Sequence, residues 1–219
     1  MMHRFILAAS LILLGGCVTR PAAWDYTNFQ RAKPASLLVM PPVNDSPDVK
    51  ATPGVWSQAT QPLAEAGYYV LPVTLVDETF RSNGVYTAND AQSIPLPKLR
   101  DFFGADAAVY IKVNKYGTSY SVLASETRVE VEARILDLRS GDLLWKGSAF
   151  ATSAEQQQAQ GGLVGLLVQA VVNQIIGTAT DAGYTYAGIA TARLMAAPKY
   201  NGVLPGPRSP LYGQPPVTQ

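Results

Sequence analysis

Two stretches in which apolar and polar side chains alternate constrain the fold of this chain more than any other feature. From 107 to 114, Val109, Ile111 and Val113 alternate with polar or aromatic residues, and residues 128–135 repeat the pattern. A period of two places successive side chains on opposite faces of a strand. We therefore predict two strands that each bury one face and expose the other.

The remaining segments complete the prediction of a mixed α/β domain. Further strands are predicted at Ser36–Met40, Tyr68–Leu71 and Leu143–Phe150, and helices at Gly54–Ala66, Val73–Arg81, Pro97–Phe103 and Asp181–Ala196. Pro62 is expected either to kink the first helix or to mark its true start. The order is β-α-β-α-(α)-β-β-β with C-terminal helices. It predicts a mixed sheet of about five strands, parallel at first and antiparallel at the end.

The amino end has the pattern of an export signal. A positive start at residues 1–4 precedes the apolar run Phe5–Leu14, which is broken only by Ser10. As a helix this run would rise about 15 Å, half of the roughly 30 Å hydrocarbon core of a bilayer. The length therefore predicts a signal peptide and not a membrane span.

Leu14-Gly15-Gly16-Cys17 resembles the bacterial lipobox. The resemblance implies cleavage between Gly16 and Cys17, with a diacylglyceryl group and an N-acyl chain on the new terminal cysteine. Two or more acyl chains hold a protein durably on a bilayer. Val18 stands where an aspartate would favour the inner membrane, so the pattern points to the outer membrane.

We expect four segments along the chain. Residues 1–16 are the lipoprotein signal peptide, 17–35 a lipid-anchored tether, 36–198 a single α/β domain and 199–219 a tail rich in proline and glycine. The tether lacks a sustained period, although its aromatic residues leave docking on the domain open. The tail has too few apolar residues to predict packing.

The composition excludes several chemistries. The lone histidine is His3 and the lone cysteine is Cys17, so the domain has neither, and histidine-based triads and zinc sites are excluded. Lys and Arg number 17 against 16 Asp and Glu, and losing Arg4 makes the mature chain formally neutral (17 − 1 = 16). Neutrality argues against a nucleic-acid partner. We predict no catalytic residue, no metal site and no cofactor beyond the lipid on Cys17.

Asn44, Asp45 and Asp48 follow the first predicted strand, where open α/β sheets tend to bind ligands. Two carboxylates set about 5–9 Å apart can perform acid–base chemistry on a glycosidic bond. The run Asn-Asp-Ser-Pro is equally typical of a turn that satisfies its own backbone. A turn and a ligand or catalytic site therefore both stay open.

The segment 163–176 is the most apolar one after the signal. It includes Leu163, Leu166, Leu167 and Val171. As a helix it would be about 21 Å long, which is short for a membrane span. Three alternatives stay open for this segment: packing on the sheet, a surface for self-association or for a partner, and a membrane span. A self-association surface predicts a homo-oligomer.

One strand is predicted to present a row of charges to water. Arg128, Glu130, Glu132 and Arg134 alternate along it and are expected to form cross-strand ion pairs, with a charged binding face as the alternative. An aromatic contact patch is also open, formed by Trp145 with Tyr110, Tyr116 and Tyr120.

Several blocks of the sequence resemble a family of bacterial lipoproteins of unknown function that includes a surface-antigen candidate from Neisseria. The blocks are the lipobox, LVMPPVNDSPDVKAT (38–52), PLAEAGYYVLPV (62–73), GADAAVYIKV (104–113) and LDLRSGDLLWKG (136–147). More distantly, the strand order is similar to the TolB amino-terminal domain and to the curli secretion lipoprotein CsgG. The family has no attributed catalytic residues.

The resemblance implies a non-enzymatic outer-membrane lipoprotein. Its α/β domain, in the periplasm or exposed at the cell surface, would be a docking or assembly module of an envelope secretion or transport complex. A CsgG-like lipoprotein is the partner that the resemblance suggests. The alternative hypothesis is an enzyme or ligand binder that acts on cell-wall material through Asp45 and Asp48.

Overall fold

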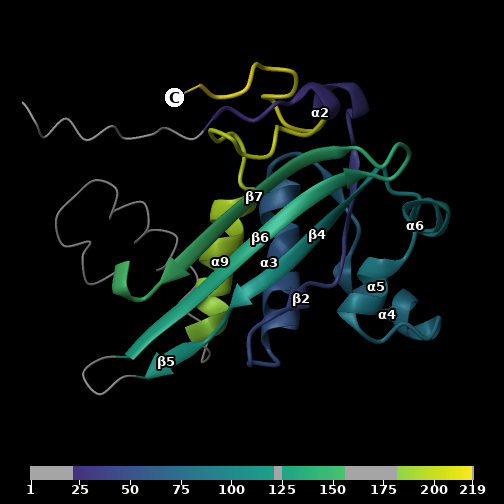
Figure 1. Cartoon of the computed structure of the whole chain (residues 1–219). Coiled ribbons are helices and arrows are strands. Elements are labelled where there is room, and N and C mark those ends of the chain that lie inside the picture. Colours follow the sequence, from purple (N-terminus) through teal and green to yellow (C-terminus); the bar gives the residue numbers. More distant parts are fainter. Residues whose placement is uncertain (1–21, 121–124, 156–181, 219) are drawn as a thin grey trace, which may run out of the picture.

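The computed structural model describes residues 22–120, 125–155 and 182–218, and Figure 1 shows their arrangement. The strands are β1 (Ser36–Val39), β2 (Val43–Asn44), β3 (Tyr69–Val70), β4 (Ala107–Lys115), β5 (Thr118–Tyr120), β6 (Ser125–Asp137) and β7 (Leu143–Thr152). The helices are α2 (Thr27–Ala32), α3 (Ala51–Glu65), α4 (Val73–Ser82), α5 (Ala88–Ser93), α6 (Leu96–Phe103) and α9 (Ala182–Met195). The predicted mixed α/β fold is confirmed.

The strands form one mixed sheet with five lanes, in the order β3, β1, β4, β6, β7. The short strand β2 continues the lane of β1 beside β4, and β5 continues the lane of β4 beside β6. β3, β1 and β4 run parallel, whereas β4, β6 and β7 run antiparallel. The predicted parallel beginning and antiparallel end are therefore both present.

Two lanes are interrupted, and the interruptions explain the short strands that the sequence pattern missed. Pro41 and Pro42 separate β1 from β2, because proline has no N–H to donate to a ladder. The Gln92 side chain closes this gap by donating to the carbonyl oxygens of Pro41 (2.8 Å) and Ile111 (3.1 Å). Strands of two or three residues are too short to show a period.

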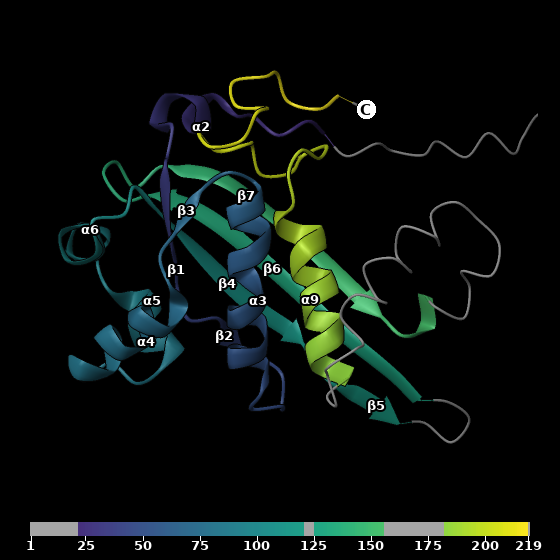
Figure 2. The same cartoon turned by 180° about the vertical axis from the view of Figure 1, so that it is seen from behind.

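The two faces of the sheet have different surroundings. Helices α3 and α9 lie across one face, behind the sheet in Figure 1 and in front of it in Figure 2. We call this the covered face. The alternating residues Val109, Ile111, Val131 and Ile135 point into it and are almost fully buried. The predicted alternation of β4 and β6 is therefore confirmed.

The long helices follow the predicted ranges closely. α3 begins at Ala51, and Pro62 lies inside it, so the idea that Pro62 marks the start of the helix is wrong. α9 packs on α3, β6 and β7 through small residues such as Ala187 and Ala190, which are fully buried. Small side chains allow the two helices to lie close together over the sheet.

The docking that sequence analysis left open for the aromatic residues of the tether is present from Trp24 onward. Tyr26 and Phe29 are buried in the core, and the intervening chain forms α2. The Tyr26 hydroxyl donates to the carbonyl of Gly202 at 2.5 Å, and the Trp24 indole donates to the carbonyl of Leu144 at 3.1 Å. Three separate aromatic anchors dock this segment, and such anchors need no regular period.

The prediction that residues 199–219 form an unpacked tail is wrong for much of that range. Val203 is buried, and the backbone N–H of Gly206 donates to the carbonyl of Ala66 at 2.7 Å. The Tyr68 hydroxyl donates to the carbonyl of Leu204 at 2.5 Å. The segment docks mainly through backbone hydrogen bonds, which apolar content does not reveal.

Several predicted positions lie outside the described residues. They are the cleavage and lipid-attachment residues Gly16 and Cys17, and Leu163, Leu166, Leu167 and Val171 of the apolar segment 163–176. The predictions for them remain predictions.

Candidate functional site

The three polar residues after β1 lie at one end of the sheet and form a turn. Asn44 ends β2, and its side-chain oxygen accepts from the backbone N–H (2.8 Å) and the hydroxyl (2.7 Å) of Ser46. Its amide donates to the carbonyl of Asp48 at 2.9 Å. The Asp48 carboxylate accepts from the backbone N–H of Lys50 at 2.9 Å, one residue before α3. Asn44 and Asp48 therefore organise the entry into α3.

Asp45 is joined to β4 by an ion pair. Its carboxylate lies 2.6 Å from the Lys112 ammonium. This hydrogen bond, together with the negative charge of Asp45, raises the pKa of Lys112 above its ordinary value. Asp45 and Asp48 are thus both engaged within the fold, which supports the turn over a paired-carboxylate catalytic site.

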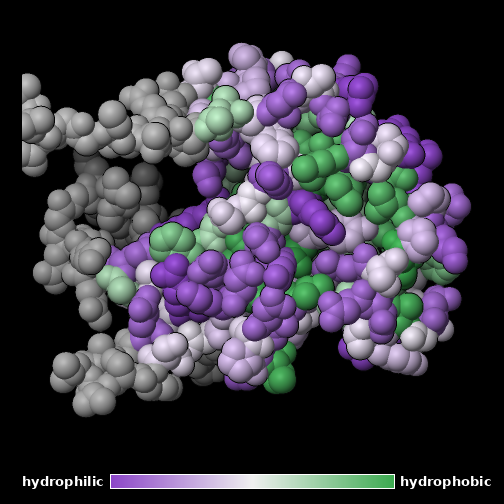
Figure 3. Space-filling view, viewed as in Figure 1, coloured by the Kyte–Doolittle hydropathy of each residue, from purple (hydrophilic) through white to green (hydrophobic). Residues whose placement is uncertain are grey.

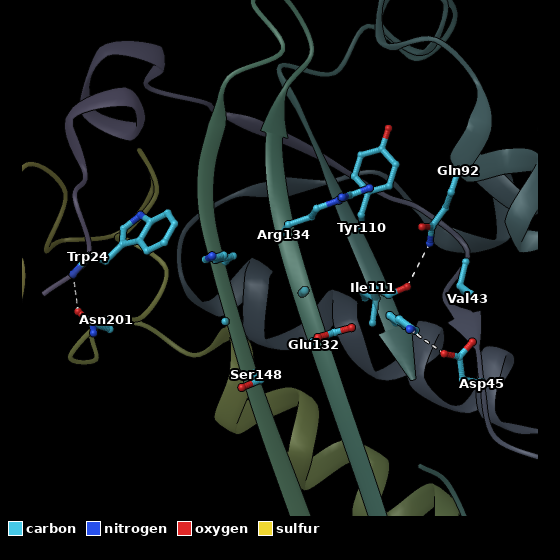
Figure 4. Close-up of a pocket in the computed structure, with 14 residues that line it drawn as sticks. Trp24, Val43, Asp45, Gln92, Tyr110, Ile111, Glu132, Arg134, Ser148 and Asn201 are labelled. Carbon is cyan, nitrogen blue, oxygen red and sulfur yellow. Dashed lines mark hydrogen bonds and ion pairs between the residues drawn. The ribbon is translucent and has the colours of Figure 1, made fainter. Parts of the chain in front are cut away.

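The face of the sheet opposite α3 and α9 holds the largest groove described. We call it the open face; it carries Tyr110, Lys112, Glu132, Arg134, Lys146 and Ser148. The groove has a volume of about 760 Å³, and Trp24, Asp45 and Gln92 extend its lining beyond the strands. The surface over β6 and β7 is mainly hydrophilic (Figure 3), and the groove crosses the strands between Trp24 and Gln92 (Figure 4).

The strand register builds a cationic row across the open face. Tyr110 of β4 is directly opposite Arg134 of β6, which is directly opposite Lys146 of β7. The Arg134 guanidinium lies 5.2 Å from the centre of the Tyr110 ring, as Figure 4 shows, and the Lys146 ammonium lies 5.8 Å from the Trp24 ring. Burial raises the pKa of the Tyr110 hydroxyl, so this residue is a neutral support for Arg134.

Farther along β6, beyond the exposed Glu132, two residues of opposite charge pair with each other. Arg128 and Glu130 form an ion pair at 3.2 Å along the strand, and Lys115 of β4 adds a longer contact to Glu130 at 3.8 Å. The expected cross-strand pairing is present in the longer Lys115–Glu130 contact, whereas Arg128 and Glu130 pair along a single strand. The Arg128 guanidinium also lies 4.5 Å from the centre of the exposed Phe150 ring.

The aromatic patch that sequence analysis left open does not form from Trp145 and Tyr116. Trp145 is buried on the covered side, and its indole donates to the carbonyl of Asn201 at 2.9 Å. Tyr116 is buried as well, whereas Tyr110 lines the groove. The second aromatic of the groove is Trp24, which sequence analysis placed in the tether. The sequence signal was its place in a segment whose aromatic residues left docking on the domain open.

Smaller grooves lie elsewhere on the described residues. One of about 480 Å³ shares Ser148 with the open-face groove and is lined by charged residues that include Arg128, Glu155 and Arg193. A smaller apolar groove of about 370 Å³ lies between α4 and α6 and is lined by Phe80, Phe102 and Phe103. In ranges 22–120, 125–155 and 182–218, no group of three or more His, Cys, Asp or Glu side chains is placed to hold a metal ion. No helix in those ranges has the length and apolarity to cross a membrane.

The fold and the groove define a class: a mixed α/β domain that covers one sheet face with helices and leaves the other open. Residues 24–208 match the family described as "Putative lipoprotein GNA1162-like", and the chain belongs to that family. The expected resemblance to a lipoprotein family known from Neisseria is confirmed. The more distant similarity to TolB and CsgG stays a prediction.

Two relatives from Neisseria meningitidis support this assignment. The "Putative lipoprotein NMB1124/NMB1162" of serogroup B strain MC58 is 46% identical over 202 residues, covering 92% of this chain and 94% of the relative. The crystal structure of lipoprotein GNA1162 is 48% identical and has a TM-score of 0.55. That match covers 66% of this chain and all of the other. Neither description states an activity.

Proposed function

We propose that this chain is a non-enzymatic outer-membrane lipoprotein that docks partner proteins in an envelope secretion or transport complex. The observation that carries the proposal is the open face of the sheet, where β4, β6 and β7 present aromatic and charged side chains to a groove of about 760 Å³. Aromatic and arginine side chains are enriched where proteins bind one another. A CsgG-like lipoprotein is the first partner to test, on the sequence resemblance.

The engaged carboxylates favour docking over the alternative of a cell-wall enzyme. Asp45 is paired with Lys112, and Asp48 accepts from the backbone at the start of α3. A glycosidase needs one carboxyl group as an acid and a second as a base or nucleophile. Two carboxylates that already hold a turn and an ion pair are poorly placed for those roles.

The docking proposal is tested by site-specific photo-crosslinking in cells. A photoreactive amino acid replaces Ser148 or Glu132 on the open face, and Glu78 on α4 serves as the control position. We expect discrete adducts with one or a few identified envelope proteins from the two open-face positions and none of them from Glu78. Equal adducts from all three positions would contradict docking through this face.

The alternative is tested with an Asp45→Ala/Asp48→Ala double variant. Under the docking proposal this variant keeps its open-face adducts, and neither it nor the parent protein degrades purified peptidoglycan. Degradation by the parent protein that the double variant loses would establish the enzyme instead.

The lipid anchor is tested by two neighbouring substitutions. Cys17→Ser removes the sulfur that the diacylglyceryl group requires, so we expect an unacylated protein that leaves the membrane fraction. Val18→Asp keeps the cysteine, and the expected result is an acylated protein that moves from the outer to the inner membrane. Mass spectrometry and membrane fractionation measure both. A Cys17→Ser protein that stays in the membrane fraction would contradict the anchor.

A further inference from the structure

The two cations of the row, Arg134 and Lys146, lie in a groove that Glu132 also lines, yet neither is held by a carboxylate of the described residues. Arg134 and Lys146 are direct cross-strand partners, and like charges in that position destabilise a sheet. Within the described parts of the chain, neither forms an ion pair. Their neighbours differ, since Lys112 is paired with Asp45 and Arg128 with Glu130. The row therefore complements an anionic group from outside this part of the chain.

The outer edge of β7 has backbone groups that point away from the sheet. The backbone N–H of Ser153 donates to the carbonyl of Thr127 at 2.9 Å, which places the ladder bonds at the odd-numbered residues of β7. In an antiparallel ladder the alternate residues then direct their N–H and C=O groups outward. In β7 these include Lys146 and Ser148, whose side chains are exposed.

At each end of this outward edge, a side chain from elsewhere already donates to an outward carbonyl group. The Trp24 indole donates to the carbonyl of Leu144 at 3.1 Å, and the Arg193 guanidinium donates to the carbonyl of Phe150 at 2.8 Å. Between them, the described residues supply no partner for the outward groups of Lys146 and Ser148. We call these two residues the free edge. The span from 146 to 150 is about 13 Å, which suits a strand of four or five residues.

We propose that the free edge pairs with an extended, acidic segment of a partner protein, whose carboxylates lie against Lys146 and Arg134. The inference rests on the proposed docking function and names the partner's chemistry. Unpaired N–H and C=O groups call for another polypeptide backbone, as in other cases of strand addition. The unpaired cations then select acidic side chains.

Two simpler explanations each account for only part of the observations, which are the two unpaired cations and the outward backbone groups of β7. An edge lysine can serve merely to discourage strand pairing, but this does not explain a second unpaired cation directly across from it. A phosphate-rich ligand would satisfy the cations, but it offers no peptide backbone to the outward N–H and C=O groups of Lys146 and Ser148. A peptide can place its carboxylates one at a time and also satisfies the edge.

The probe is a pair of blocked nine-residue peptides, with glutamate alternating with valine in one and lysine alternating with valine in the other. Binding to the full mature lipoprotein in detergent micelles is measured by fluorescence anisotropy. We expect the glutamate peptide to bind about tenfold more tightly or better, because two exposed charge contacts change from attractive to repulsive. A third, glutamate-containing peptide with N-methylated backbone amides should lose a similar factor.

Variants of the protein separate charge from edge pairing. Arg134→Glu/Lys146→Glu should reverse the preference between the two peptides. The matched control is Arg208→Glu, since Arg208 also stacks on an aromatic ring, Tyr69 at 5.5 Å, but beside the opposite edge strand β3. Ser148→Pro removes one outward N–H without touching the ladder to β6, so it should abolish peptide binding while Ser148→Ala retains it.

The outcomes that overturn the proposal are distinct from failure of the docking function. Equal binding of the glutamate and lysine peptides would remove the acidic segment, and undiminished binding of the N-methylated peptide would remove edge pairing. Binding of phosphatidylglycerol vesicles but not of peptides would assign the row to lipid instead. Concentration-dependent self-association lost in Ser148→Pro would assign the edge to a second copy. In each case open-face crosslinks to an envelope protein would still support docking.

Discussion

The covered and open faces of the sheet are built by the same strands and differ in what their side chains do. On β6, Ile135 is fully buried beneath the helices, whereas its neighbour Arg134 is exposed and rests on Tyr110. On β7, Gly147 faces Trp145 and Leu194, whereas its neighbour Ser148 faces water. Side chains on the covered face form the core, whereas those on the open face make exposed charge and aromatic contacts.

The comparison teaches where the chain tolerates change. A covered-face residue is surrounded by packed atoms, so altering its volume leaves a cavity or forces a displacement. An open-face residue contributes through exposed charge contacts and aromatic stacking, which add little to the free energy of unfolding. Adjacent positions along one strand should therefore respond very differently to the same type of substitution.

The largest contrast is expected between Ile135→Ala and Arg134→Ala. Ile135→Ala should lower the free energy of unfolding by about 2–5 kcal/mol, because it leaves a cavity beneath the helices. Arg134→Ala should cost less than about 1 kcal/mol, the value of an exposed stacked cation. Urea denaturation followed by circular dichroism measures both. Equal losses would show that the open face is also part of the core.

A smaller contrast is expected between Gly147→Val and Ser148→Val. A Cβ at position 147 would lie 2.5 Å from Trp145 and 3.3 Å from Leu194, so a side chain there must displace the indole or α9. We expect a loss of roughly 1–3 kcal/mol from overpacking for Gly147→Val, and a change within about 0.5 kcal/mol for Ser148→Val. Thermal unfolding of the two variants provides the check, and a neutral Gly147→Val would mean that α9 lies further from β7.

The alternating strands and the long helices could be predicted because each carries its own period. The site could be predicted only in part. Arg134 and Glu132 were placed on a solvent-facing strand, but their position beside Lys146 and Tyr110 depends on cross-strand register, which local pattern does not specify. Trp24 reaches the groove from a segment far away in the sequence, so its role depends on tertiary contacts alone.

The smallest effect is expected at the ion pair on the open face. The Asp45 carboxylate raises the pKa of Lys112, so Asp45→Asn should bring that pKa back toward the ordinary lysine value of about 10.4. A lysine whose pKa is higher in the folded than in the unfolded state stabilises the folded protein at pH values below its unfolded-state pKa. This contribution is lost as the pH rises through the folded-state pKa. NMR titration of the Lys112 side chain measures the shift. The melting temperature at neutral pH should not change measurably, because both groups are exposed.

Both ends of the described chain dock onto one end of the sheet, and this constrains how the proposed lipid anchor would hold the domain. Asn201 accepts from the backbone N–H of Trp24 and donates to the carbonyl of Ala22, so hydrogen bonds join the first and last described segments there. Four residues separate Ala22 from Cys17, so the two lie at most about 18 Å apart. The proposed lipid on Cys17 would therefore hold the folded domain close to the bilayer surface. A force applied by the proposed partner would reach that lipid through the segment that Asn201 ties to the other end of the described chain.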